Sequence, residues 1–85
     1  MVGQQTIQEQ VIDISRDYLG PAADRFINRQ IRNHLRKNPE RLAKKDLVEL
    51  ISWIKVAMAI LTDDDKIVNE YVRHLHKLTK ENLAE

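Results

Sequence analysis

The chain of 85 residues contains no cysteine, only two glycines and two prolines, and only 5% aromatic residues. Without cysteine, neither disulfide bonds nor a cysteine zinc site can stabilise so short a chain. No uncharged apolar run approaches the roughly 18 residues of a membrane-spanning helix, and the first residues lack the basic and apolar regions of a signal peptide. We therefore expect a cytoplasmic protein with no membrane span.

What the sequence does contain is typical of a folded helical domain. Hydrophobic residues make up 42% and charged residues 32% of the chain, which is unlike a disordered polypeptide. The length allows one domain, residues 1–85, and no second one. A domain this small buries a modest share of its surface, and dimerisation is one common way to gain more.

Apolar residues recur at spacings of three and four, the period of an amphipathic helix. No stretch alternates with period two, so we expect no sheet. Short connections favour antiparallel neighbours. The sequence therefore predicts an all-α fold, a compact bundle of about four amphipathic and mostly antiparallel helices. The predicted helices cover residues 6–19, 21–37, 47–61 and 64–82. The first has a narrow apolar stripe of Ile7, Val11, Ile14 and Tyr18, and the fourth is expected to bury Ile67, Val68, Tyr71, Leu75 and Leu78.

The predicted boundaries depend on a few punctuating residues. Gly20 suits the left-handed position that ends a helix, and Pro21 suits the first turn of the next helix. Asn38 precedes a proline and therefore disfavours helical dihedrals, so we expect the second helix to end before Asn38-Pro39. Asp46 is a candidate N-cap for the third helix. Thr62 and a carboxylate three residues later resemble a capping box before the fourth helix.

The third predicted helix is apolar on two sides. Its second apolar face, Trp53, Val56 and Ile60, adjoins the main one and is our candidate for a protein contact, including self-association. A helix this apolar lies at the centre of its domain or presents its second face to a partner. The main face consists of Leu47, Leu50, Ile51, Ile54, Met58 and Leu61.

The chain carries no recognisable catalytic or metal-binding motif, so we expect no enzymatic activity, no cofactor and no metal. Ser15 and Ser52 both fall in mid-helix without a nucleophile elbow, and the two glycines form no phosphate-binding loop. His74 and His76 are two apart on a helix and face different directions, unlike zinc ligands spaced by three or four. The three aspartates at 63–65 do not match a calcium loop.

Four arginines, at spacings of four, three and four, fall on one side of the second predicted helix. We call Arg25, Arg29, Arg32 and Arg36 the arginine ridge. Residues 16–45 hold nine basic and three acidic residues, whereas residues 46–65 hold one basic and five acidic. Such asymmetry attracts an acidic protein, a phosphate backbone or an anionic surface. The simpler interpretation, which we favour, is that the ridge is the solvated side of an amphipathic helix.

One short segment carries a family resemblance. Tyr18-Leu19-Gly20-Pro21-Ala22-Ala23 resembles the turn between two helices in small all-helical modules of bacterial, particularly cyanobacterial, proteins, of uncharacterised function. A segment like Asp46-Leu47-Val48-Glu49-Leu50 opens a later helix in such modules, which are sometimes appended to signalling domains. The resemblance implies an accessory or interaction role, without a catalytic activity.

These features predict a non-enzymatic helical module of bacterial signalling or regulation, which binds another protein or binds itself as a homodimer. The alternative is a nucleic-acid or polyanion binder that uses the arginine ridge. The formal net charge is only +1, so the chain lacks the strong basic excess of most nucleic-acid-binding proteins. No helix-turn-helix motif is recognisable either.

Overall fold

The computed structural model describes residues 6–81, and every regular element in this range is helical. The predicted all-α class is thus confirmed. The second predicted helix is shorter and more broken than expected, so the chain has three long helices and one short one in the described range. They are α1 (Ile7–Leu19), α2 (Ala23–Gln30), α3 (Leu47–Leu61) and α4 (Asp65–Glu81).

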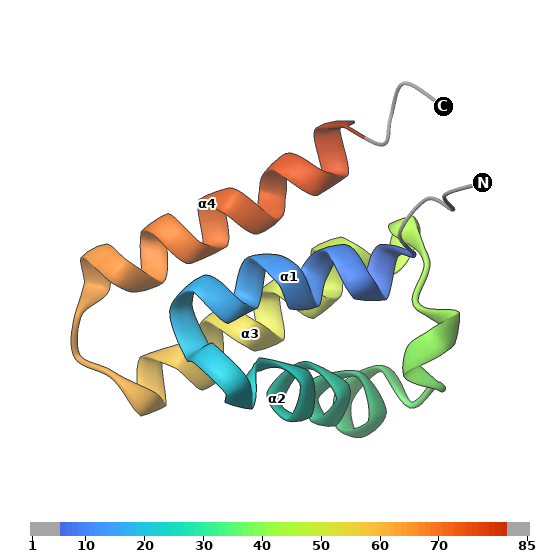
Figure 1. Ribbon diagram of the computed structural model, residues 1–85, viewed down its shortest axis with the longest axis horizontal. Helices are drawn as coiled ribbons and strands as arrows, with labels where there is room; N and C mark the ends of the chain where they lie inside the picture. Colours follow the sequence, from blue (N-terminus) through green and yellow to red (C-terminus); the bar gives the residue numbers. More distant parts are fainter. Residues whose placement is uncertain (1–5, 82–85) are drawn as a thin grey trace.

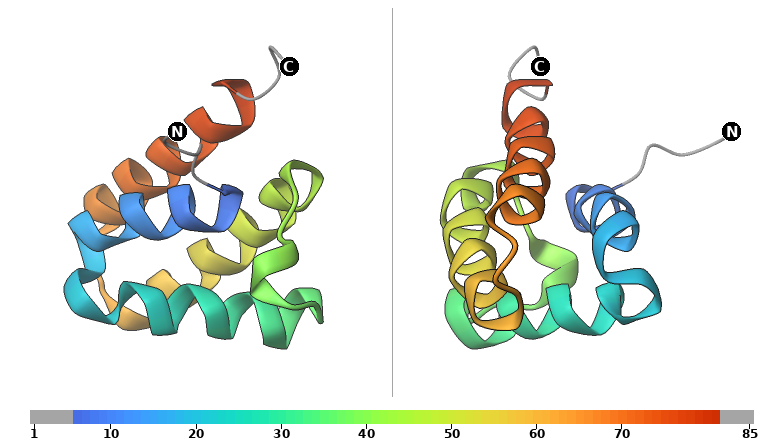
Figure 2. Two further views of the ribbon diagram at one scale, coloured as in Figure 1. Left: turned by 45° about the vertical axis from the view of Figure 1, so that its right-hand side comes forward. Right: turned by 90° about the vertical axis from the view of Figure 1, so that its left-hand side faces the viewer.

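The helices alternate in direction along the chain (Figure 1). α4 packs against both α1 and α3, and α1 also packs against α2. α2 runs obliquely beneath the others, from below α1 to below α3 (Figure 2). The core lies among these helices and is made largely of aliphatic side chains, including Val11, Ile27, Leu47, Leu50, Ile54 and Leu75, together with Tyr71.

Two residues predicted to be buried are not. Leu61 is 62% exposed and Ile67 is 42% exposed. Both lie in terminal turns that flank the connection between α3 and α4, where few neighbouring elements are present to cover a side chain. Conversely, Ile12 and Ser15 of α1 are buried although the narrow predicted stripe left them out.

The first helix begins and ends with well-defined caps. Thr6 and Glu9 form a reciprocal capping box, in which each side chain accepts the other residue's backbone N–H at 3.0 Å. At the other end, Gly20 has φ +63° and ψ −144° and its N–H donates to the carbonyl of Arg16. A Cβ built at Gly20 would meet no atom within 4 Å, so the backbone dihedral and not space requires glycine here.

The second predicted helix consists of three pieces. A 3-10 turn, Gly20–Ala22, leads into α2, and a π-helical turn, Ile31–Leu35, follows it. The helix ends at Arg36, which has left-handed dihedrals of φ 56° and ψ 44°. The prediction that Asn38-Pro39 ends this helix was therefore wrong. Asn38 instead caps a separate 3-10 turn, Pro39–Arg41, by accepting the N–H of Glu40.

Asp46 directly precedes α3, as predicted, but its side chain does not cap that helix. The carboxylate accepts the N–H of Ala43 at 3.0 Å and binds Lys37 Nζ at 2.6 Å. Burial raises the pKa of Asp46, but hydrogen bonds from Lys37 and Ala43 and the nearby lysine charges outweigh it, so the pKa lies below its ordinary value. Asp46 thus joins the start of α3 to the segment that follows α2.

The start of α4 also differs from the predicted capping box. Asp64, and not Thr62, caps this helix, because its carboxylate accepts the N–H groups of Lys66 and Ile67 at 3.0 and 3.2 Å. Thr62 Oγ1 accepts the N–H of Asp64 and shapes the connection. None of the described helices is long and apolar enough to cross a membrane. The predicted fourth helix extended to Asn82, which lies outside the described residues.

Candidate protein-binding surface

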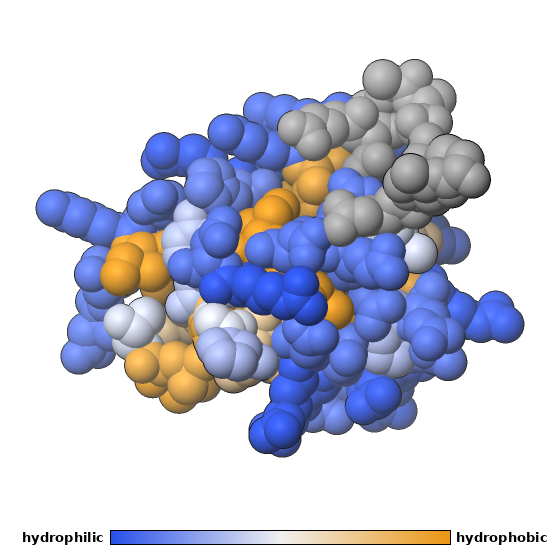
Figure 3. Space-filling model, viewed as in Figure 1, coloured by the Kyte–Doolittle hydropathy of each residue, from blue (hydrophilic) through white to orange (hydrophobic). Residues whose placement is uncertain are grey.

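The second apolar face of α3 lies on the outside of the molecule. Trp53, Val56 and Ile60 are 36%, 53% and 81% exposed, respectively, and we call them the α3 outer face. Val48 and Leu61 add to the exposed apolar surface at the two ends of the same helix. A hydrophobic area is visible at the end of α3, at the lower left of Figure 3. The predicted candidate contact residues are therefore accessible to a partner.

One of these side chains has an internal neighbour that the sequence did not reveal. The ring of His34, from the π-helical turn, stacks on the indole of Trp53 with 3.9 Å between centroids and 7° between ring planes. The stack covers one side of the indole and links the turn to the middle of α3. Periodicity could not predict it, because the contact joins two elements whose relative placement depends on the whole fold.

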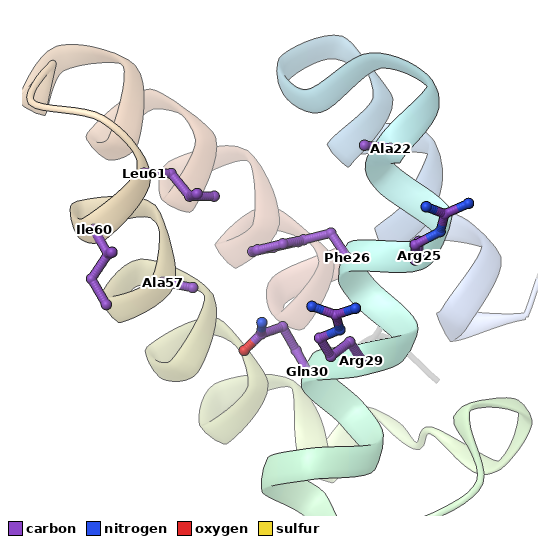
Figure 4. Close-up of a pocket in the computed structure, with 8 residues that line it drawn as sticks. All are labelled: Ala22, Arg25, Phe26, Arg29, Gln30, Ala57, Ile60 and Leu61. Carbon is purple, nitrogen blue, oxygen red and sulfur yellow. The ribbon is translucent and has the colours of Figure 1, made fainter.

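A groove of about 480 Å³ separates α2 from the C-terminal half of α3. Phe26 extends from α2 across this groove toward α3, and the amide of Gln30 points the same way (Figure 4). Gln30 is buried, and its Oε1 has no hydrogen-bond partner among the described residues. Arg25 and Arg29 stand on the α2 side of the groove. The remaining lining residues are Ala22, Ala57, Ile60 and Leu61.

All members of the arginine ridge are exposed, and they follow one another along the same side of the molecule. Arg25, Arg29 and Arg32 line one shallow hollow, and Arg32 and Arg36 line the next. No described carboxylate lies within ion-pairing distance of any of the four, whereas Arg16 pairs with both Asp13 and Asp24. Arg25 and Arg29 of the ridge thus border the groove, and all four arginines remain available to an acidic partner.

The far side of the molecule holds a polar cluster between α1 and α4. Ser15 donates to the carbonyl of Val11 at 2.7 Å and is hydrogen-bonded to the hydroxyl of Tyr71. The ring of Tyr18 stacks on that of Tyr71 with centroids 4.7 Å apart, and its hydroxyl is hydrogen-bonded to His74 Nδ1 at 2.7 Å. The cluster fixes how α1 and α4 lie against each other.

This cluster does not resemble a reactive site. Ser15 is fully buried, so a substrate cannot reach its hydroxyl. Burial raises the pKa of Tyr71 to about 12, which keeps its hydroxyl neutral at ordinary pH. Partial burial and the negative charge of Glu70 likewise raise the pKa of Tyr18. The other serine considered above, Ser52, is exposed on α3 and donates to the carbonyl of Val48.

Within residues 6–81, no three histidine, aspartate or glutamate side chains gather as metal ligands would. His76 points to solvent, while the ring of His74 is engaged by Tyr18.

No protein-family model, no curated protein and no solved structure matches this chain. The physical evidence for a binding partner therefore lies in the surface of α2 and α3.

Proposed function

We propose that this chain is a non-catalytic helical module that binds a protein through its α2–α3 surface. The observation that carries the proposal is the α3 outer face, a row of exposed apolar side chains that continues into the groove between α3 and α2. Exposed apolar surface bordered by polar groups is characteristic of interaction sites. Aromatic residues and arginine are also the residue types that contribute most to binding at interfaces, and both are present here.

The charge of the surface indicates the kind of partner. Arg25 and Arg29 stand beside apolar residues, and arginine pairs with carboxylates in a planar, bidentate geometry. The partner surface should therefore combine apolar side chains with at least one carboxylate. We further propose that the module acts in the cytoplasm. The resemblance of residues 18–23 supports a bacterial origin and an accessory role in a signalling or regulatory assembly.

Affinity capture from a nuclease-treated bacterial lysate tests the proposal. The wild-type chain is compared as bait with Ile60→Asp, which places a charge at the most exposed position of the apolar row. Ile67→Asp is the matched control, because Ile67 is an exposed isoleucine that belongs to α4 and does not line the groove. We expect the wild type and the control to retain the same proteins and Ile60→Asp to lose them. Equal capture by all three baits would contradict the proposal.

Binding of nucleic acid or another polyanion is the second candidate, because the four exposed arginines of the ridge have no described carboxylate partner. Its signature would be affinity that falls steeply with salt and is lost progressively as the arginines are replaced by glutamine. Fluorescence anisotropy with labelled DNA, RNA and heparin at about 50 mM salt measures this. Absence of binding under these conditions removes the candidate.

A further inference from the structure

One acidic side chain, Glu49, lies on the same side of α3 as the α3 outer face. At about 100° per residue, Glu49, Val56 and Ile60 fall within about 40° of one another on α3. The side chain of Glu49 is exposed, and no described cation lies within ion-pairing distance of its carboxylate. A partner that covers this apolar face must therefore also bring a positive charge to Glu49, because a covered carboxylate without a counter-charge is strongly unfavourable.

The same molecule carries the complementary charge at the other end of the face. Arg25 and Arg29 lie across the groove from Ile60, near the C-terminal end of α3, whereas Glu49 lies in its first turn (Figure 4). The carboxylate of Glu49 and the guanidinium groups of Arg25 and Arg29 thus lie at opposite ends of the apolar row. A surface with this arrangement is complementary to itself when one copy is turned end to end against another.

We propose that the partner of this surface is a second copy of the chain, bound through an antiparallel, two-fold symmetric pairing of α3 with α3. If the two-fold axis passes between Trp53 and Val56, Glu49 of each copy lies opposite Ile60 of the other and beside that copy's Arg29. A parallel pairing would instead place the two Glu49 carboxylates together, which like-charge repulsion disfavours. The symmetric pairing covers the apolar row of both copies and forms two charge pairs, each between Glu49 of one copy and Arg29 of the other.

This inference rests on the proposed function and names the partner. Glu49 to Ile60 spans about 17 Å of helix, a short contact by the standard of stable dimers, so we expect reversible association in the micromolar range. Sedimentation equilibrium of the purified full chain, from about 1 µM to about 1 mM, measures it directly. The wild type should change from monomer to dimer across this range, and Ile60→Asp should remain monomeric.

A charge-exchange cycle tests the register. Glu49→Arg and Arg29→Glu should each weaken the dimer by at least about tenfold, and the double variant should recover at least about fivefold over either one. Lys55→Glu, on the side of α3 away from the contact, is the control and should associate as the wild type does. Circular dichroism confirms that each variant is folded.

Three outcomes overturn the inference. A wild type that stays monomeric at about 1 mM excludes the second copy as partner. An Ile60→Asp variant that dimerises like the wild type excludes this face, and a double charge variant no better than the single ones excludes this register. If the wild type is monomeric but its lysate capture is lost with Ile60→Asp, the proposed function stands and only the partner is wrong. If that capture does not depend on Ile60 either, the proposed function and the proposed partner are both wrong.

Discussion

At the scale of single residues, the most unusual feature of the core is a hydroxyl. Tyr71 is fully buried, and its hydroxyl meets that of Ser15, which itself donates to the carbonyl of Val11. A buried hydroxyl without a partner costs on the order of 1–3 kcal/mol, so the two residues depend on each other. Apolar periodicity predicted a buried Tyr71, but it could not predict the serine that satisfies its hydroxyl from the opposite helix.

Replacement of Tyr71 by phenylalanine should change how stability depends on alkaline pH. The pKa of Tyr71 rises from 10.0 to about 12 on folding, so its contribution is complete below pH 10 and is lost as the pH rises toward 12. Over this interval the free energy of unfolding of the wild type should fall by roughly 2–3 kcal/mol more than that of Tyr71→Phe. At neutral pH the variant should be about 1 kcal/mol less stable, because Ser15 loses a partner.

Urea unfolding of both proteins between about pH 9 and 12 measures the difference, and the comparison removes the titration of lysines that both share. Parallel stability curves for wild type and variant would show that Tyr71 titrates no differently in the folded state.

A second residue, Arg36, adopts a backbone conformation that suits glycine. Its left-handed dihedrals disfavour a side chain by about 1–2 kcal/mol. Arg36→Gly should therefore stabilise the protein by about 0.5–1 kcal/mol, after the greater freedom of glycine in the unfolded chain is subtracted. Arg32→Gly, within the π-helical turn, should destabilise it by a similar amount. The denaturant concentration at the unfolding midpoint of each variant, relative to the wild type, measures these changes. An Arg36→Gly variant less stable than the wild type would contradict the expected strain.

At the scale of the elements, the sequence predicted α1, α3 and α4 well because each has a clear apolar stripe and a polar boundary. It was wrong about the second helix, where the apolar spacing runs unbroken to Leu35 although the backbone changes to a π turn at Ile31 and the helix ends at Arg36. Helical periodicity does not distinguish α from π hydrogen bonding, and a left-handed arginine leaves no signal in composition.

The candidate site was predicted in the same uneven way. Trp53, Val56 and Ile60 could be singled out because they form a second apolar face on one helix. Phe26 and Gln30 could not be assigned to a groove beside them, because that groove depends on the oblique crossing of α2 under α3. The sequence therefore indicated the exposed apolar face, and only the fold revealed the groove at its border.

At the scale of the whole molecule, proposed self-association links stability to concentration. Ligands that bind only the folded state stabilise it by mass action, and a second copy acts as such a ligand. The melting temperature of the wild type should rise by several degrees between about 5 µM and about 500 µM protein, whereas that of Ile60→Asp should stay constant. Differential scanning calorimetry at both concentrations measures this, and a constant wild-type melting temperature would contradict dimerisation.

The position of the sole tryptophan has a practical consequence. Trp53 lies on the α3 outer face, with one side of its indole against His34 and 36% of its surface exposed. Anything that covers this face removes water from the indole and should shift its fluorescence emission toward shorter wavelengths. The molecule therefore carries its own optical reporter at the proposed interface, and each binding experiment can be followed without a label.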